Sequence, residues 1–533
     1  MLLVAARLVE SPSGARPALW SRPELLLVGT LTLLALSVRM IGLADVPANF
    51  SGDEGEMGEM ARAVLAGRLE DPFTTGWLGH ATLWFYAQAL SLTVVGDDVT
   101  GLRALSAVLG AATIPALYWF ARLLHGPLVA ILAAFLLAGY HFHVHFSRIG
   151  LNNVADPLLV VLAFAALVSG YRARSPFRLA LAGVALGLAQ HSYYGARLAL
   201  FAVGAMLVHQ LVFDRRRLAG AAPGLALGVI GFVVAFGPLV RVPLFHWADF
   251  QSGLTRQGLF QTGAFADRVA AGASPLRILF GQTRDALGGL ATAPVRGPFY
   301  EPWVPLLDPV SAVLAAIGLV LVLRRWRRPE SAVLLAWLLG AVLFGNVLLV
   351  DPPQAHHYVS IAPLLCLLAA SGLDAAARFA GALAPRAAPV IPVLTLVVVA
   401  ALATWSLRFY FEEYSPRRSY GGERTQAATE IAERLASGPR DTFIYFHGAP
   451  YTYLGNGTIR FIAQPQGVDV LEPLAADEPL SLLPERTRPV FVFHPARAAE
   501  IEVVRRRYRG GVIRTFRVPE GAPAFLMYEA KPG

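Results

Sequence analysis

Residues 25–56 read LLLVGTLTLLALSVRMIGLADVPANFSGDEGE and join the first long apolar run, Leu25 to Leu43, to an acidic turn. The run approaches the length of a membrane-crossing helix, which needs roughly 20 apolar residues. Asp53 and Glu54 follow within a few residues, at the edge of the membrane, where two adjacent carboxylates are costly unless they have a function. The stretch therefore predicts a membrane enzyme whose catalytic centre lies in the loop after the first span.

The composition supports a membrane protein. Hydrophobic residues make up 55% of the 533 residues, charged residues make up 15%, and the mean hydropathy is +0.53. Soluble globular chains contain about 25% charged residues. The formal charge of +9 does not indicate a nucleic-acid partner, because the arginines lie in short clusters between apolar runs and not on one soluble face. The single cysteine, Cys366, excludes an internal disulfide framework and a cysteine-rich metal site.

The apolar runs predict a mainly α-helical, polytopic transmembrane bundle of about eleven spans, preceded by a cytoplasmic N-terminus at residues 1–24. The runs are residues 25–44, 102–122, 127–145, 152–170, 178–191, 196–213, 222–240, 305–323, 331–350, 358–377 and 389–410. Arginine clusters fall at alternate ends of these runs, and the positive-inside tendency places those ends in the cytoplasm. The clusters include the stretches YRAR at 171–174, DRRR at 214–217 and RRWRR at 324–328.

One short run, Ala81 to Gly96, is rich in aromatic residues. Counting it as a span would move every later arginine cluster to the outer side, so we expect it to lie at the outer interface. The transmembrane catalytic domain then covers residues 25–411. Its outer face carries a first loop at 45–100 and a long segment at 241–303.

After Phe411 the composition becomes that of a soluble domain. The pattern predicts a helix over 423–435 and strands over 442–446, 490–493, 512–518 and 524–528. We expect residues 412–533 to form a small α/β domain on the extracytoplasmic side of the plasma or inner membrane.

Several segments, taken in order, carry a resemblance to a known family. They are Asp53-Glu54 with a helix over 57–66, residues 83–92 before GLRALS at 101–106, and FSRIGL at 146–151. This order resembles the GT-C membrane glycosyltransferases, in particular glycosyltransferase family 39, the group of protein O-mannosyltransferases and aminoarabinose transferases. The resemblance covers roughly residues 25–240. It implies inverting transfer of a sugar from a polyprenyl-phosphate carrier, with the acid after the first span as base.

The chain departs from the family pattern in two places. A Lys-Pro-Pro type segment late in the first outer loop is replaced by WLGHAT at 77–82. The acid found in relatives shortly after the Ser-Arg-Ile segment would fall near Asn153, and Asp156 stands three residues further on. Asp156 is therefore our candidate for a second carboxylate near the donor.

Glycosyl transfer from a phosphate-linked sugar requires a base for the attacking hydroxyl and hydrogen bonds or positive charge for the leaving phosphate. We assign Asp53 as the base and Glu54 as a residue that orients Asp53 or the sugar. The alternative is that both acids only cap the helix that follows, since acidic residues favour a first turn.

Cations and aromatic residues at the outer ends of spans are the candidates for donor binding. Arg148 and Arg197 are isolated arginines that the positive-inside tendency does not explain, and a guanidinium fork suits a phosphate. Their alternative role is to reach lipid headgroups. Arg241 and Arg256, in the long outer segment, are weaker candidates. The remaining candidates are His356, His357 and Tyr358, which begin a span, and Tyr194, which could stack on a sugar or belong to the interfacial aromatic belt.

The sequence specifies no cofactor and leaves a divalent metal ion open. His141 and His145 have the i, i+4 spacing of some metal sites and are weak candidate ligands.

The sequence thus predicts a hexosyltransferase-class enzyme whose partners are a polyprenyl-phosphate-linked sugar, membrane lipid, and a glycan, lipid or protein acceptor. Two alternatives stay open. One is a transporter or flippase of lipid-linked sugars, and the other is a non-catalytic membrane assembly subunit.

Overall fold

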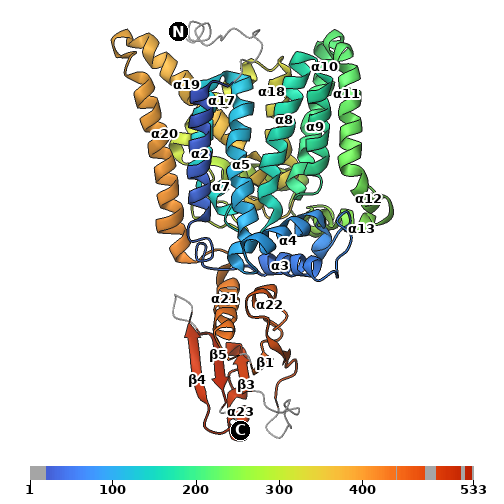
Figure 1. Ribbon diagram of the computed structural model, residues 1–533, viewed down its shortest axis with the longest axis vertical. Coiled ribbons are helices and arrows are strands. Elements are labelled where there is room, and N and C mark those ends of the chain that lie inside the picture. The colour runs from blue at the N-terminus through green and yellow to red at the C-terminus, as the bar shows by residue number, and fades with distance from the viewer. Residues whose placement is uncertain (1–19, 440, 475–487, 518–522, 531–533) are drawn as a thin grey trace.

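The computed structural model describes residues 20–439, 441–474, 488–517 and 523–530 (Figure 1). Most of the predicted cytoplasmic N-terminus, and Val518 at the end of one predicted strand, lie outside these ranges. Each of the eleven predicted runs coincides with a helix. These helices are α2 (Arg22–Met40), α5 (Val99–His125), α6 (Pro127–Gly139), α8 (Ala155–Ala173), α9 (Pro176–Ala189), α10 (Leu198–Phe213), α11 (Arg215–Phe236), α17 (Pro309–Arg324), α18 (Pro329–Val342), α19 (Ala362–Leu383) and α20 (Ile391–Arg408).

Eight of these helices, with the short turns that extend some of them, are long and apolar enough to cross a membrane. The other three, α6, α9 and α17, are apolar but have 13, 14 and 16 residues. Because a helix rises about 1.5 Å per residue, they fall short of a hydrocarbon layer about 30 Å thick. The chain is therefore a polytopic integral membrane protein. Within the described residues, eight helices have the length and composition of membrane spans, and the three shorter apolar helices pack among them.

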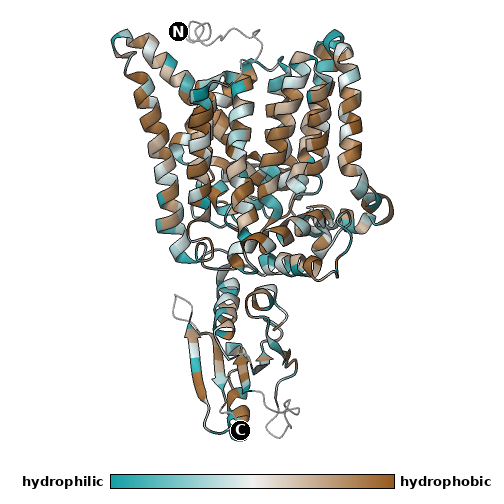
Figure 2. Cartoon of the chain, viewed as in Figure 1, coloured by the Kyte–Doolittle hydropathy of each residue, from teal (hydrophilic) through white to brown (hydrophobic). Residues whose placement is uncertain are grey.

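Burial separates the central helices from the peripheral ones. In the most apolar windows of α8 and α19, 83% of residues are buried, whereas the corresponding share for α11 is 17%. The side chains that α11 and α20 leave uncovered are mainly Val, Leu and Ile, and both helices are brown along their outer sides (Figure 2). Such a surface suits contact with lipid tails and not with water.

Two helices of the first outer loop, α3 (Gly52–Leu65) and α4 (Leu83–Val95), lie across one end of the bundle (Figure 1). The orientation of α4 agrees with the expectation that residues 81–96 do not span. The predicted long outer segment is found at the same end and is largely helical. Its helices are α12 (Arg241–Phe245), α13 (Trp247–Phe250), α14 (Ser252–Gln257), α15 (Ala264–Ala270) and α16 (Pro275–Ala291).

The C-terminal part projects from this same end of the bundle (Figure 1). It begins with α21 (Gly422–Ala436) and contains a five-stranded sheet of order β2-β1-β3-β5-β4. The central strand β1 (Thr442–His447) pairs in parallel with β2 (Gln466–Asp469) and β3 (Arg488–Phe493). The strand β5 (Pro523–Glu529) runs antiparallel to β3 and to β4 (Val512–Arg517). The predicted helix and the four predicted strands agree with α21, β1, β3, β4 and β5.

Three short elements of this domain were not predicted. They are α22 (Gly457–Ala463), α23 (Glu500–Arg507) and β2. With four to eight residues each, they are too short for a clear hydrophobic period. The predicted domain boundary after residue 411 falls inside a π-helical segment, Phe409–Tyr414, that continues directly from α20.

Candidate active site

The first turn of α3 presents the acidic pair that opened the sequence argument. Ser51 caps the helix: its hydroxyl accepts from the Glu54 amide at 3.1 Å, and the Glu54 carboxylate accepts from the Ser51 amide at 3.2 Å. This reciprocal capping box fixes where the helix begins. The two acids consequently have different surroundings, since Glu54 is fully buried and Asp53 is half-buried.

Glu54 lies at the centre of a buried network. Arg103 on α5 donates to both of its oxygens, at 2.9 and 3.0 Å. The Gly150 amide donates to it at 2.6 Å and the Tyr420 hydroxyl at 2.9 Å. With its oxygens engaged on every side, Glu54 is a positioning residue that ties α3 to the bundle. That Glu54 orients Asp53 or the sugar stays a prediction, and the partners of its oxygens favour the role toward Asp53.

The carboxylate of Asp53 makes no hydrogen bond or ion pair with any described residue. Burial, assisted by the neighbouring charges of Glu56 and Glu54, raises the pKa of Asp53 to about 6, while Arg256 acts in the opposite direction. A carboxylate with a pKa close to neutral pH, held near its site but unpaired, has the property that a general base requires.

His80 lies in an aromatic cluster that the sequence did not predict. Its ring stacks between Trp77 and Tyr193, with ring centroids 5.8 and 6.1 Å away. Burial and the charges of Arg256 and Arg197 lower the pKa of His80 to about 4, so the ring is neutral at pH 7. Burial raises the pKa of Tyr193, and the charges of Asp156, Tyr194 and Asp53 act in the same direction, so Asp53 and Tyr193 influence each other.

A tight turn delivers His80 to this position. Leu78 and Gly79 both have positive φ, of 52° and 77°. A Cβ on Gly79 would lie 2.6 Å from the Asp249 carbonyl oxygen, so the turn also packs closely on the long outer segment. The sequence signal was present in WLGH at 77–80, where a glycine precedes a lone histidine ahead of an apolar run.

Two arginines line this cluster from different elements. Arg256 on α14 donates to the Leu78 carbonyl at 3.1 Å and is otherwise exposed. Arg197, half-buried, donates to the Phe250 carbonyl at 3.1 Å and lies 4.5 Å above the ring of Tyr194. Arg256 was a weaker sequence candidate than Arg148, but it is Arg256 whose charge lowers the pKa of Asp53.

The predicted phosphate ligand Arg148 is wrong for a plain geometric reason. All three of its guanidinium nitrogens donate to backbone carbonyls at the end of α2 and in the turn after it, at 2.7–3.0 Å. The carbonyls belong to Val38, Ile41, Gly42 and Val46. Arg148 is fully buried and uses four of its five N–H donors on this turn, so its guanidinium is not presented to a phosphate.

Asp156 and Tyr358 also have structural partners. Asp156 accepts from the Ser192 hydroxyl at 2.7 Å and the Tyr193 amide at 2.9 Å, and it thereby fixes the loop that carries Tyr193. Tyr358 donates to the Ala286 carbonyl at 2.6 Å and is fully buried. Asp156 thus acts on the cluster through Tyr193, and Tyr358 does not reach it.

The two consecutive histidines differ from each other. His357 is paired with Gln257 at 2.8 Å. Both ring nitrogens of His356 are buried and without a hydrogen-bond partner in the described chain, and its ring meets that of Tyr193 edge-on, 6.2 Å between centroids. Burying an imidazole whose nitrogens have no hydrogen-bond partner costs free energy of folding. His356 is therefore the histidine placed to meet a polar ligand.

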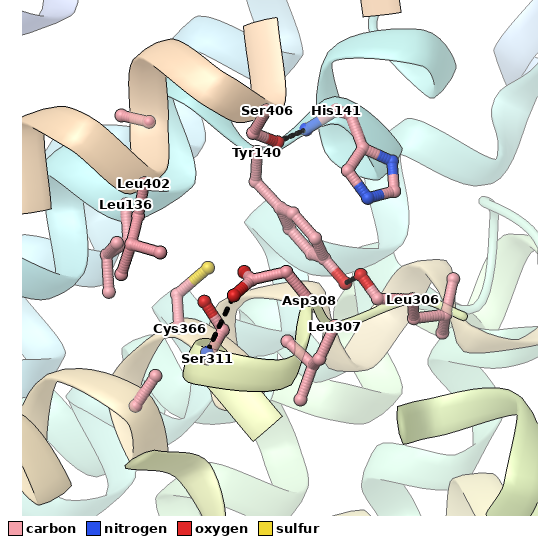
Figure 3. Close-up of a pocket in the computed structure, with 12 residues that line it drawn as sticks. Leu136, Tyr140, His141, Leu306, Leu307, Asp308, Ser311, Cys366, Leu402 and Ser406 are labelled. Atoms are coloured by element: carbon pink, nitrogen blue, oxygen red, sulfur yellow. Dashed lines mark hydrogen bonds between the residues drawn. The ribbon is translucent and has the colours of Figure 1, made fainter. Parts of the chain in front are cut away.

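The candidate metal ligands lie elsewhere. His141 borders a small cavity with Tyr140, Asp308 and Cys366, as Figure 3 shows. Its Nδ1 is hydrogen-bonded to the Tyr300 hydroxyl at 2.7 Å, and His145 Nε2 is hydrogen-bonded to the Phe299 carbonyl at 2.6 Å. Within the described ranges no three His, Cys, Asp or Glu side chains form a metal-binding group. The pair therefore offers a metal ion no third ligand.

The C-terminal domain packs directly on the turn that carries Asp53. The Phe50 amide donates to the Thr429 hydroxyl at 3.0 Å, and the Thr458 hydroxyl donates to the Phe50 carbonyl at 2.9 Å. On α3, a Cβ added to Gly55 would lie 2.1 Å from the backbone of Gly457, so α3 and α22 touch through glycines. The turn that carries Asp53 is thus held by residues of the C-terminal domain that lie 379 and 408 positions further along the chain.

Residues 79–240 match the family model described as dolichyl-phosphate-mannose-protein mannosyltransferase. The match covers much of the bundle and the cluster around His80, Tyr193 and Arg197. A search of curated protein sequences finds no significant match to this chain.

Solved structures extend the likeness to nearly the whole chain. ArnT from Cupriavidus metallidurans, bound to undecaprenyl phosphate, is 14% identical with a TM-score of 0.56, over 96% of this chain and 100% of ArnT. The chain has the GT-C fold. The apo form of the same ArnT gives 15% identity and a TM-score of 0.57, over 95% of this chain and 99% of that one. The GT-C fold also accounts for the match to the archaeal oligosaccharyltransferase AglB from Archaeoglobus fulgidus, in complex with an inhibitory peptide and a dolichol-phosphate. That match has 14% identity and a TM-score of 0.53, over 96% of this chain and 74% of AglB. Together with the family match, the GT-C fold indicates a glycosyltransferase.

Proposed function

We propose that this protein is an inverting glycosyltransferase that moves a sugar, of the hexose class, from a polyprenyl-phosphate carrier to an acceptor hydroxyl at the extracytoplasmic surface. The observation that carries the proposal is the Asp53 carboxylate: half-buried, unpaired, with its pKa raised to about 6, beside arginines at the bundle end where α3 lies. The polyprenyl phosphates bound by ArnT and AglB support the class of donor.

The proposed step needs one base for the acceptor hydroxyl and positively charged groups for the leaving phosphate. Asp53 takes the proton of the acceptor hydroxyl while that oxygen attacks C1 of the sugar, and the bond from C1 to the phosphate oxygen breaks. The phosphate keeps the electron pair and leaves as polyprenyl phosphate. Attack from the face opposite the leaving group inverts the anomeric centre. A single carboxylate base suits this displacement, whereas sugar hydrolases use two flanking carboxylates.

Arg256 and Arg197 are the cations that we assign to the departing phosphate. Both influence the pKa of His80, which lies against Tyr193, and the charge of Arg256 also acts on Asp53. Guanidinium groups placed where negative charge develops stabilise a transition state more than a ground state. His356, with two unsatisfied ring nitrogens, is the assigned contact for the sugar or phosphate.

The test is transfer from a labelled polyprenyl-phosphate sugar in membranes that contain the full chain. We expect Asp53→Asn to retain donor binding and to lose transfer by about 100-fold or more, the usual contribution of a general base. Glu59→Gln, further along α3 and paired with Arg62 and Arg460, is the matched control and is expected to stay active. Near-normal transfer by Asp53→Asn would reject the assignment. Donor counterflow in liposomes that lack acceptor would favour the transporter alternative instead.

A further inference from the structure

The end of the bundle opposite the C-terminal domain contains a cavity of about 370 Å³. This volume falls within the range of small-molecule sites, roughly 300–1,000 Å³. The cavity lies between the α10–α11 turn and the α17–α18 turn. Its polar lining is Arg217, Arg327 and Arg328 with Asp214 and Gln210, and Phe213 borders it.

The three arginines outnumber the one carboxylate of this cavity, Asp214, and so give its lining a net positive charge. None of them forms an ion pair with a carboxylate among the described residues. Asp214 is occupied as the cap of α11, where it accepts from the Arg217 amide at 3.0 Å. The nearest other acid along the chain, Glu330, is paired with Arg172 at 2.5 Å.

Topology signals alone do not explain this arrangement. The positive-inside tendency requires arginines in the loops, but it does not require two loops more than 100 residues apart to direct arginines into one cavity. Arginines that converge in excess of the carboxylates around them are arranged as in phosphate sites, where a guanidinium fork can bind two oxygens.

The border of the cavity is suited to a lipid. Phe213 meets Trp326 edge-on at 5.0 Å, and both rings are nearly half exposed, as in an interfacial aromatic belt. The turn of α10 directly before Phe213 exposes Leu211 and Val212. A ligand phosphate in the cavity would therefore have an uncovered apolar helix face beside it.

We propose that this cavity binds the phosphate of an anionic phospholipid headgroup, with the acyl chains along α10. The proposal does not depend on the transferase assignment, because the cavity lies at the other end of the bundle. Anionic lipids are concentrated in the cytoplasmic leaflet, the side on which the positive-inside tendency places these arginines.

The experiment is native mass spectrometry of the detergent-purified full chain, titrated with phosphatidylglycerol or with phosphatidylcholine of the same acyl chains. We expect the wild type to retain phosphatidylglycerol preferentially, with one lipid bound most tightly. Each basic residue near the membrane surface contributes about a factor of five to the binding of an anionic lipid. Arg217→Gln should therefore weaken that binding about fivefold, and the double variant Arg327→Gln with Arg328→Gln about 25-fold.

The matched control is the pair Arg215→Gln and Arg216→Gln, which removes two arginines from the same surface but not from the cavity. Its binding should remain that of the wild type, and all variants should melt at the wild-type temperature. Equal loss in the control pair, or equal retention of phosphatidylcholine, would overturn the proposal. So would binding of inorganic phosphate or glycerol 3-phosphate as tight as that of the lipid, because the apolar face of α10 would then contribute nothing.

Discussion

Asp53 is the residue on which the chemistry depends, and its raised pKa gives a direct test by pH. The carboxylate must be ionised to accept a proton, and burial raises its pKa to about 6. We therefore expect kcat/KM to fall as the pH drops through about 6, whereas an ordinary aspartate would hold activity to about pH 4. A pH profile of the purified enzyme checks this. Activity that is constant down to pH 4.5 would contradict the environment described for Asp53.

The same pKa has a consequence for stability. Below the ordinary aspartate pKa of 3.8, Asp53 is protonated in both the folded and the unfolded chain. Between pH 3.8 and about 6 it loses its proton in the unfolded chain but keeps it in the folded one. The free energy of unfolding therefore falls as the pH rises through this range. Asp53→Asn removes this cost. We expect the variant to be more stable than the wild type at pH 7.5, by about 1–3 kcal/mol, and equally stable near pH 3.5. Thermal unfolding at both pH values measures the difference.

Arg256 offers a second test at the residue scale. Its charge lowers the pKa of Asp53 and is assigned to the leaving phosphate. Arg256→Gln should reduce transfer about tenfold or more and move the acid limb of the pH profile to higher pH. Arg268→Gln, an arginine of the same outer segment that is paired with Asp351, is the control. A loss of rate with an unshifted acid limb would mean that Arg256 does not act on Asp53.

Among the elements, α3 holds the site together because it is fixed from both sides. Arg103 on α5 holds its first turn through Glu54, and α22 packs against its other face at Gly55. Replacing Gly55 by Ala would drive a methyl group into the Gly457 backbone, so the helices must separate. We expect Gly55→Ala to lower stability by about 1–3 kcal/mol and to reduce transfer, as measured by thermal unfolding and the transfer assay.

A glycine in open surroundings is the control for that prediction. Gly29 on α2 has no atom within 4 Å of an added Cβ. Gly29→Ala should therefore leave both stability and transfer close to those of the wild type. Equal effects of the two substitutions would show that close packing of α3 on α22 is not what matters.

Element by element, the sequence predicted what local pattern encodes. Apolar runs of span length became helices, and alternating runs became four of the five strands. The sequence failed where an element is defined by its neighbours: β2 exists because it pairs with β1, and α22 because it packs on α3. Arg148 was misassigned for a similar reason, since an isolated arginine at a span end looks the same whether it faces a ligand or four backbone carbonyls.

At the scale of the whole molecule, the arrangement puts Asp53 and the C-terminal domain at one end and the cluster Arg215–Arg217 at the other. Because the chain has one cysteine, buried Cys366, a cysteine-free background is available through Cys366→Ala. In intact cells a membrane-impermeant maleimide should label Tyr451→Cys on the C-terminal domain, and it should label Arg216→Cys only after the membrane is opened. The reverse result would place Asp53 in the cytosol and end the proposal of outer-surface transfer.

The sequence alone determined that this is a polytopic helical membrane protein with a small C-terminal α/β domain, because span length, hydropathy and arginine placement are local properties that a bilayer reads directly. It also singled out Asp53. Which of the two neighbouring acids is free, and which arginines and histidines surround it, was decided by the tertiary structure. Those properties depend on partners that are distant in sequence: Arg103 and Tyr420, 49 and 366 residues away, engage Glu54, whereas the charge of Arg256 acts on Asp53.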